Sequence, residues 1–248
     1  MPTSSFNPCA IIPVFDHEHA VARVVAAVRV AALTCLLVDD GSGAACAREL
    51  DRLAATVPGT SVLRLPVNSG KGAAMLAGFA AAWQRGYSHA LQIDADGQHA
   101  LGDITKFIEE SRGRPEALIC GRPLFDRSMP GLRRYGRYLT HGLVWLNTLS
   151  RAIPDSMCGF RVYPLAPVIA LMREEYIGRR MDFDVEIIVR MYWRRVPMRW
   201  LPTRVTYPAD GVSHFRLVRD NARMVALQLR LFCGMLRRLP RLLAPSAR

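Results

Sequence analysis

Residues 91–99 read LQIDADGQH, an apolar run that stops abruptly at two carboxylates one residue apart. A short run of β-forming residues that ends in Asp-x-Asp-Gly predicts a buried strand whose C-terminal end directs Asp94 and Asp96 into a cleft. Two clustered carboxylates repel each other unless a cation lies between them. Because carboxylate oxygens and the amide oxygen of Gln98 are hard ligands, the stretch predicts a Mg²⁺ or Mn²⁺ site rather than a zinc site. A solvated turn is the alternative interpretation.

Strand-like and helix-like segments alternate along the chain around this stretch. The apolar patterns predict strands at residues 9–15, 33–38, 61–65, 91–93 and 117–120, and helices at residues 20–30, 44–55, 73–85 and 102–112. This alternation predicts an α/β fold in which helices flank a mainly parallel sheet with right-handed crossovers. The carboxyl ends of parallel strands meet at one edge, where open α/β sheets bind their ligands.

Residues able to bind phosphate or metal follow four of these strands. In chain order they are Asp39-Asp40-Gly41-Ser42, Asn68-Ser69-Gly70-Lys71-Gly72, Asp94 with Asp96, and Gly121-Arg122. We interpret them as a nucleotide crevice, in which glycines let the backbone approach a phosphate and Lys71 supplies the counter-charge. An ordinary turn and helix cap is the alternative for residues 70–72. The sequence has neither a Walker loop nor a Gly-x-Gly-x-x-Gly after its first strand, which argues against those two phosphate sites.

Positive charge is concentrated in the second half of the chain. Residues 1–120 hold 10 Lys and Arg against 12 Asp and Glu, whereas residues 121–248 hold 23 against 9. A basic half of this kind favours an acidic partner, which phosphate esters, an anionic membrane surface or nucleic acid would provide. We expect no nucleic acid, because aromatic stacking platforms are not interleaved with the basic residues and aligned carboxylates would repel a phosphate backbone.

The C-terminal tail combines this charge with an apolar pattern. Residues 215–243 predict a basic amphipathic helix, which is typical of a segment that lies on an anionic bilayer; packing on the sheet is the alternative. We therefore divide the chain into an α/β domain, residues 1–215, and a basic tail, residues 216–248. No signal-peptide pattern and no membrane-span run is found, and the six cysteines are scattered. We expect a cytoplasmic protein, peripheral on the inner face of the cytoplasmic membrane.

Two segments before the tail carry further candidate residues. The basic residues 124–137 predict an irregular lid or acceptor-side loop, which leads into an amphipathic helix that ends at Leu149. Residues 178–195 begin with acids and run into a helix, on which Asp182 and Glu186 lie one turn apart and would repel each other. A bound cation or a catalytic role would explain this pair, and capping of the helix N-terminus is the alternative for Asp182 and Asp184.

Seven motifs occur in a fixed order over roughly residues 8–215. They are IPVF (12–15), VDDGS (38–42), NSGKG (68–72), DADGQH (94–99), GR (121–122), CGFR (158–161) and FDVE (183–186). This series resembles the family 2 glycosyltransferases of the GT-A fold, a Rossmann-like α/β fold. Within that family the chain is similar to the dolichyl- or polyprenyl-phosphate mannosyl- and glucosyltransferases, and to glycosyltransferases of bacterial aryl-polyene or glycolipid clusters.

The resemblance implies inverting transfer of a sugar from a UDP- or GDP-sugar to a lipid-linked acceptor. It implies a donor site formed by Pro13, Asp39, Asp40, Gly41, Ser42, Lys71, Gly72, Asp94 and Ala95. It also implies a Mg²⁺ or Mn²⁺ ion, held by Asp94, Asp96 and Gln98, that neutralises charge as the nucleoside diphosphate leaves.

The nature of the acceptor decides which catalytic groups the resemblance implies. A lipid phosphate is already a nucleophile, so that Arg122 and the loop arginines would only orient it. A lipid or pigment hydroxyl needs a base, for which Asp184, at the position of the family's base, is the first candidate and Asp182 the second. Phosphate-acceptor enzymes tend to carry an arginine and a lysine near the late Gly-x-Ser, where this chain has Pro208 and His214. His214 is therefore a candidate contact to the metal or the diphosphate, and both acceptor classes remain open.

Two other functions are compatible with such a sheet. A sugar-nucleotide nucleotidyltransferase needs a Gly-rich, basic loop directly after its first strand, and residues 13–17 (PVFDH) contain none. A catalytically silent GT-A module that serves as a membrane-bound scaffold would carry the same motifs, so the sequence leaves it open.

Overall fold

A computed structural model describes residues 5–125, 131–206 and 217–243 of the chain. Its strands form one seven-stranded sheet in the order β3-β2-β1-β4-β6-β5-β7. The bounds are β1 Pro8–Val14, β2 Thr34–Asp39, β3 Thr60–Arg64, β4 His89–Gln92, β5 Leu118–Phe125, β6 Arg161–Pro164 and β7 Met198–Val205. Every neighbouring pair of described strands is parallel except the two pairs that β6 makes with β4 and β5. The predicted mainly parallel α/β sheet is therefore confirmed.

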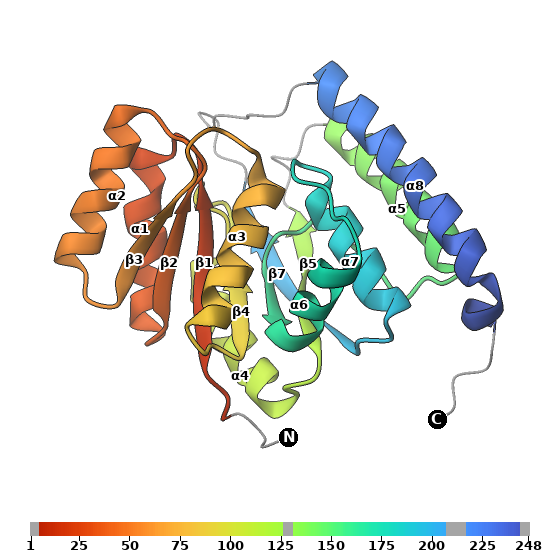
Figure 1. The fold of residues 1–248 in the computed structure, drawn as a ribbon, viewed down its shortest axis with the longest axis horizontal. Helices are drawn as coiled ribbons and strands as arrows, with labels where there is room; N and C mark the ends of the chain where they lie inside the picture. The colour runs from red at the N-terminus through yellow and green to blue at the C-terminus, as the bar shows by residue number, and fades with distance from the viewer. Residues whose placement is uncertain (1–4, 126–130, 207–216, 244–248) are drawn as a thin grey trace.

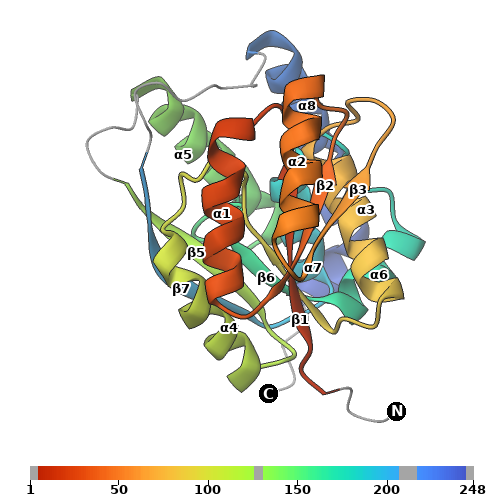
Figure 2. The same cartoon turned by 90° about the vertical axis from the view of Figure 1, so that its left-hand side faces the viewer.

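The central strand β1 shows how the sequence specifies helices on both faces of this sheet. Cys9 and Ile11 belong to one hydrophobic core and Ala10 and Ile12 to the other, because successive side chains of a strand point to opposite faces. All four are buried, so both faces need a cover. One face is covered by α1 (Glu18–Val30), α2 (Ala44–Thr56) and α4 (Ile104–Gly113), and the other by α3 (Lys71–Gln84), α6 (Leu165–Glu174) and α7 (Phe183–Trp193). In Figure 2 the central strand β1 lies between α1 and α4 on one side and α3 and α6 on the other.

Two long helices, α5 (Gly131–Thr148) and α8 (Leu217–Leu243), lie side by side at one end of the molecule (Figure 1). In their buried interface the Asn147 amide donates a hydrogen bond of 2.8 Å to Gln228 Oε1. Arg230 of α8 also pairs with Glu186 of α7, with 2.7 Å between Nη2 and Oε2. The C-terminal helix therefore packs on other helices. Among the described residues, no helix has an apolar run long enough to cross a bilayer.

Some elements differ from their predicted bounds. β5 continues to Phe125 because it pairs with β7 along its whole length, so the irregular segment predicted from residue 124 begins too early. α5 already begins at Gly131, which makes the predicted irregular residues 131–137 helical. α6 was not predicted, although its buried residues Leu165, Val168 and Leu171 have helical spacing.

Candidate active site

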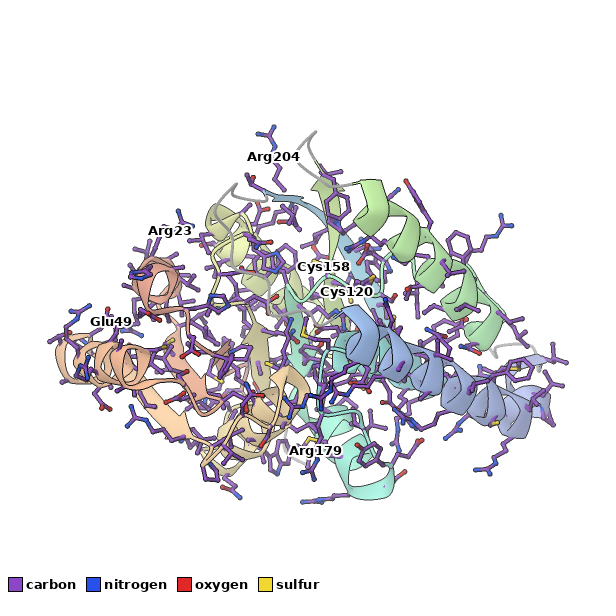
Figure 3. All side chains as sticks on the ribbon, turned by 90° about the horizontal axis from the view of Figure 1, so that it is seen from above. Arg23, Glu49, Cys120, Cys158, Arg179 and Arg204 are labelled. Carbon is purple, nitrogen blue, oxygen red and sulfur yellow. The ribbon has the colours of Figure 1, made fainter. Side chains whose placement is uncertain are left out.

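The parallel strands bring the predicted groups to one edge of the sheet, which Figure 3 views from above. Asp40 follows β2 and anchors the loop before α3, because its two carboxylate oxygens accept the backbone N–H groups of Ser69 and Gly70, each at 2.7 Å. Gly41 has a φ of +72°, and a Cβ at this position would lie 2.6 Å from backbone atoms of Val67 and Asn68. Burial raises the pKa of Asp40, against the effect of the two backbone hydrogen bonds. Residues 40–41 thus fix the 68–72 loop beside β2.

Asp39, the last residue of β2, is held by two partners and is almost completely buried. Its Oδ1 accepts the backbone N–H of Ser42 at 2.9 Å, and its Oδ2 accepts Nε of Arg64 at 3.0 Å. Pro13 lies next to this group, paired with Val38 in the β1–β2 register. The sequence reasoning missed Arg64, because only the β2–β3 register, in which Asp39 pairs with Arg64, brings the two residues together.

Lys71, the first residue of α3, joins two acids from distant parts of the chain. Its Nζ lies 2.7 Å from Oδ1 of Asp94 and 2.8 Å from Oδ2 of Asp184. Burial alone would lower the pKa of Lys71, but the charges of Asp184 and Asp94 outweigh burial and raise it. Burial alone would likewise raise the pKa of Asp94, but Lys71 and His99 outweigh it and lower that pKa. Lys71 and Asp94 are therefore both charged at neutral pH, and Lys71 neutralises much of the negative charge at the end of β4.

A buried network positions Asp184 behind Lys71. Gln92 of β4 donates to Asp184 Oδ1 at 2.8 Å, and its own Oε1 accepts the Tyr163 hydroxyl at 3.0 Å. Arg161 is fully buried and donates to the backbone oxygen of Asp184 at 2.8 Å and to that of Ser156 at 2.8 Å. Both carboxylate oxygens of Asp184 are thus engaged, one by an amide and one by an ammonium. Gln92 was missed, and a polar residue inside an otherwise apolar strand was the signal for it.

Asp96 follows Asp94 by two residues, is partly exposed and lines the cavity described below. Its Oδ1 accepts the backbone N–H of Gln98 at 3.0 Å. Burial, followed by the charge of Asp94, raises the pKa of Asp96. His99 Nε2 lies 3.6 Å from Asp94 Oδ2, an oxygen that also accepts Lys71 Nζ at 3.0 Å. In the described part of the chain, no group of three His, Cys, Asp or Glu side chains is arranged to hold a metal by itself.

A cavity of about 90 Å³ opens next to these residues. It is lined by Asp94, Asp96, Gln98, His99, Pro123, Phe125, Arg137, Met157, Cys158, Gly159 and Val205. Cys158 lies near the centre of the view in Figure 3. A Cβ on Gly159 would lie 2.8 Å from Lys71 Nζ and 3.0 Å from Asp94 Oδ2, so this glycine covers the Lys71–Asp94 pair at close range.

None of the three predicted catalytic residues, Asp184, Asp182 and Arg122, is among the residues that line this cavity. Arg122 is exposed, and its neighbour in β5, Pro123, lines the cavity. Because successive side chains of a strand point to opposite faces, the Arg122 side chain points away from the cavity. The arginine that lines the cavity is Arg137 of α5, whose guanidinium lies 4.7 Å from the centre of the Phe125 ring. Ala95, a predicted donor-site residue, is buried in the core beneath the loop. The candidate metal contact His214 lies outside the described residues, as does Pro208.

Asp182, another predicted catalytic residue, precedes α7 and has its contacts with Arg180 and Arg230. Its Oδ1 accepts the backbone N–H of Arg180 at 3.2 Å, and burial raises its pKa. The predicted repulsion between Asp182 and Glu186 is relieved by arginine: Arg230 Nη2 lies 3.7 Å from Asp182 and 2.7 Å from Glu186. The structure thus explains this acid pair through packing of α8, with no cation required.

Comparison with known proteins identifies a family whose match includes most of these site residues. A family model described as glycosyl transferase family 2 matches residues 9–180. The chain is 34% identical over 102 residues to a polyprenol monophosphomannose synthase of Mycolicibacterium smegmatis. The aligned residues are 40% of this chain and 38% of that protein. It is 26% identical over 162 residues to an undecaprenyl-phosphate mannosyltransferase of Micrococcus luteus, covering 62% of this chain and 64% of the relative.

A third relative is the UDP-N-acetylglucosamine–dolichyl-phosphate N-acetylglucosaminyltransferase of Methanococcus voltae, 23% identical over 168 residues, which are 65% of this chain and 63% of that protein. In each case the chain spans less than two thirds of the relative's length. The family match, by contrast, extends over more than half of this chain and includes the Lys71 and Asp94 motifs. The chain therefore belongs to glycosyl transferase family 2.

Proposed function

We propose that this chain transfers a sugar, with inversion, from a UDP- or GDP-sugar to a polyprenyl phosphate at a membrane surface, with the help of Mg²⁺ or Mn²⁺. The observation that carries the proposal is the state of Asp184. Its Oδ1 accepts the Gln92 amide, its Oδ2 lies 2.8 Å from the Lys71 ammonium, and the residue is only 5% exposed, an arrangement that disfavours Asp184 as the base for a hydroxyl. A phosphate acceptor needs no base, because its oxygen is already an anion.

The reaction then requires only orientation and charge neutralisation. An acceptor phosphate oxygen forms a bond to the anomeric carbon while the bond from that carbon to the diphosphate oxygen breaks in line, and the nucleoside diphosphate leaves. Arg137 is the group that we assign to the acceptor phosphate, since it lines the cavity that also contains Asp94 and Asp96. The names of the three relatives, each of which contains a polyprenol or a polyprenyl-type phosphate, support this acceptor class.

The donor would bind across the ends of β1 and β2. Asp39 and Asp40 are held by their own chain, so they shape the pocket for base and ribose beside Pro13. Gly70 and Gly72 border Lys71 where α3 begins, and a helix N-terminus favours bound phosphate. The diphosphate would lie at this point.

The residues present fit Mg²⁺ or Mn²⁺ bound together with a diphosphate. Lys71 occupies the oxygens of Asp94, whereas Asp96 has a carboxylate that repels its neighbour and is not salt-bridged among the described residues. Mg²⁺ is commonly bound by one or two carboxylates plus substrate phosphates, so Asp96, with Asp94 and Gln98 nearby, would hold it. Bound there, the ion would supply charge neutralisation for the leaving diphosphate.

The exposed side of α8 supports work at a membrane surface. Val225, Leu229, Phe232 and Leu236 recur at helical spacing and are 62%, 63%, 38% and 49% exposed. We name these four residues the apolar stripe of α8. Exposed Arg219 and Arg237 lie on the same helix. An apolar stripe with arginines beside it matches an anionic lipid surface, where a prenyl acceptor would be embedded.

A transfer assay tests the proposal. The purified chain is incubated with Mn²⁺, one labelled UDP- or GDP-sugar at a time, and either polyprenyl phosphate or the matching polyprenol in detergent micelles. We expect labelled lipid with the phosphate only, nucleoside diphosphate released in equal amount, and no product with EDTA or with Asp96→Asn. Product with the alcohol only would contradict the acceptor. Absence of transfer with every donor would favour the silent module, and a requirement for sugar phosphate and nucleoside triphosphate would indicate a nucleotidyltransferase.

A further inference from the structure

Asp155 is a buried carboxylate that the reaction proposed above does not use, and it lies directly behind the cavity. It precedes β6 and is 3% exposed. Its Oδ2 lies 2.7 Å from Nε and 2.5 Å from Nη2 of Arg137, and 3.4 Å from Nε2 of His141. Arg137 and His141 are both residues of α5, one helical turn apart. One oxygen of Asp155 therefore holds the inner face of this helix.

The other oxygen of Asp155 holds the turn that covers Lys71. Oδ1 accepts the backbone N–H of Met157 at 3.0 Å and that of Cys158 at 2.8 Å, an arrangement in which an Asp side chain replaces a backbone turn partner. Gly159 follows directly and lies against Lys71 and Asp94. Asp155 thus links the arginine of α5 to the turn above the charged cluster.

The protonation of Asp155 agrees with this arrangement. Burial alone would raise its pKa, but His141 and Arg137 outweigh burial and lower it, so the group is a carboxylate at neutral pH. A charged carboxylate fixes a guanidinium through two N–H groups far better than a neutral side chain does. Without it, the contact with the Phe125 ring would be the remaining restraint on Arg137 among the described residues that line the cavity.

We propose that Asp155 is a positioning residue for the acceptor: it holds Arg137 in the cavity and the 157–159 turn over Lys71, so that the acceptor phosphate and the donor meet in one orientation. The inference rests on the proposed function, because Arg137 is the group assigned there to the phosphate. It adds that Asp155 acts through Arg137 and touches neither substrate.

Asp155→Asn tests the inference sharply. An Asn Oδ1 still accepts the Met157 and Cys158 N–H groups, so the turn is kept, while the charge that holds Arg137 is lost. With farnesyl phosphate as acceptor we expect the acceptor KM to rise roughly tenfold to a hundredfold, with the donor KM within about twofold of wild type. Asp155→Glu, which keeps the charge, should recover part of the loss. Glu49→Gln on α2 is the control and should match wild type, because Glu49 pairs with Arg52 on its own helix and is well separated from Cys158 in Figure 3.

A double-mutant cycle separates positioning from general destabilisation. If Asp155 acts through Arg137, Asp155→Asn should have little further effect on the acceptor KM in an Arg137→Met background. Equal rises in the acceptor and donor KM, or independent effects of the two substitutions, would overturn the positioning role. The proposed function would still stand in that case if the wild-type protein transfers sugar to the prenyl phosphate. Wild-type protein that fails to use any prenyl phosphate would overturn both.

Discussion

The ammonium of Lys71 lies 2.8 Å from Oδ2 of Asp184, and this contact joins the start of α3 to the first turn of α7. The two residues are 113 positions apart in the sequence and meet beside Asp94. Because the cation lies between two carboxylates, the cluster carries less charge than its acids alone would give. Asp96, by contrast, has no salt bridge among the described residues. Its negative charge is therefore the one that a divalent ion would neutralise.

Removing the Lys71 charge should destabilise the folded protein. In Lys71→Met the carboxylates of Asp94 and Asp184 lose their shared cation, and breaking a buried ion pair on one side costs about 3–5 kcal/mol. We expect a loss of that size in the free energy of unfolding measured with urea, together with loss of transfer. Lys106→Met is the matched control, since Lys106 is exposed and donates a long bond of 3.3 Å to Pro202 O; it should change stability by less than about 0.5 kcal/mol. Equal stability of the two variants would show that the cluster adds nothing to the fold.

Asp96→Asn should stabilise the protein while it abolishes transfer. Burial and Asp94 raise the native pKa of Asp96, so the native state binds this proton more tightly than the unfolded chain does. The ionised group therefore lowers stability as pH rises through its native pKa, and the cost persists at neutral pH. The variant should melt at a higher temperature than wild type near neutral pH, and the difference should vanish in acid below the ordinary Asp pKa of about 3.9. Differential scanning calorimetry across this range measures it; a variant that melts lower at neutral pH would contradict the assignment.

Gly159→Ala should impair the site more than the fold. The added Cβ would lie 2.8 Å from Lys71 Nζ and 2.9 Å from Gln92 Nε2, and both side chains must move. Overpacking of this kind costs about 1–3 kcal/mol, and displacement of Lys71 should reduce kcat for transfer. Gly142→Ala in α5, where an added Cβ meets nothing within 4 Å, is the control and should gain up to about 1 kcal/mol. Steady-state kinetics and urea unfolding of both variants measure these effects. Full activity of Gly159→Ala would contradict the prediction, because it would mean that the turn can move without displacing Lys71.

The apolar stripe of α8 should bind lipid. Leu229→Glu replaces a side chain that is 63% exposed, so the fold should not change, yet binding to phosphatidylglycerol vesicles should weaken roughly tenfold. Vesicle sedimentation at low and high salt measures this. Val30→Glu at the end of α1, also highly exposed, should bind like wild type. Equal vesicle binding by both variants and wild type would argue against α8 as the lipid-facing element.

The sequence predicted the edge of the sheet well, because its signals are local. Acids and glycines directly after apolar runs mark strand ends, and parallel pairing then brings Asp40, Lys71 and Asp94 together. Features that depend on register or on strand direction could not be predicted in this way. The side of β5 from which Arg122 leaves is set by pairing with β7, and a shift of one residue would reverse it. The antiparallel direction of β6 and the pairing of Arg64 with Asp39 likewise follow from tertiary contacts.

The most direct test of the central claim is a crystal structure of the chain soaked with Mn²⁺ and either UDP or GDP, with anomalous data collected for manganese. We expect an anomalous peak in contact with a carboxylate oxygen of Asp96, with the diphosphate between it and the start of α3, and the nucleoside over the ends of β1 and β2. A manganese peak or a nucleotide bound away from Asp96 and Lys71 would contradict the account.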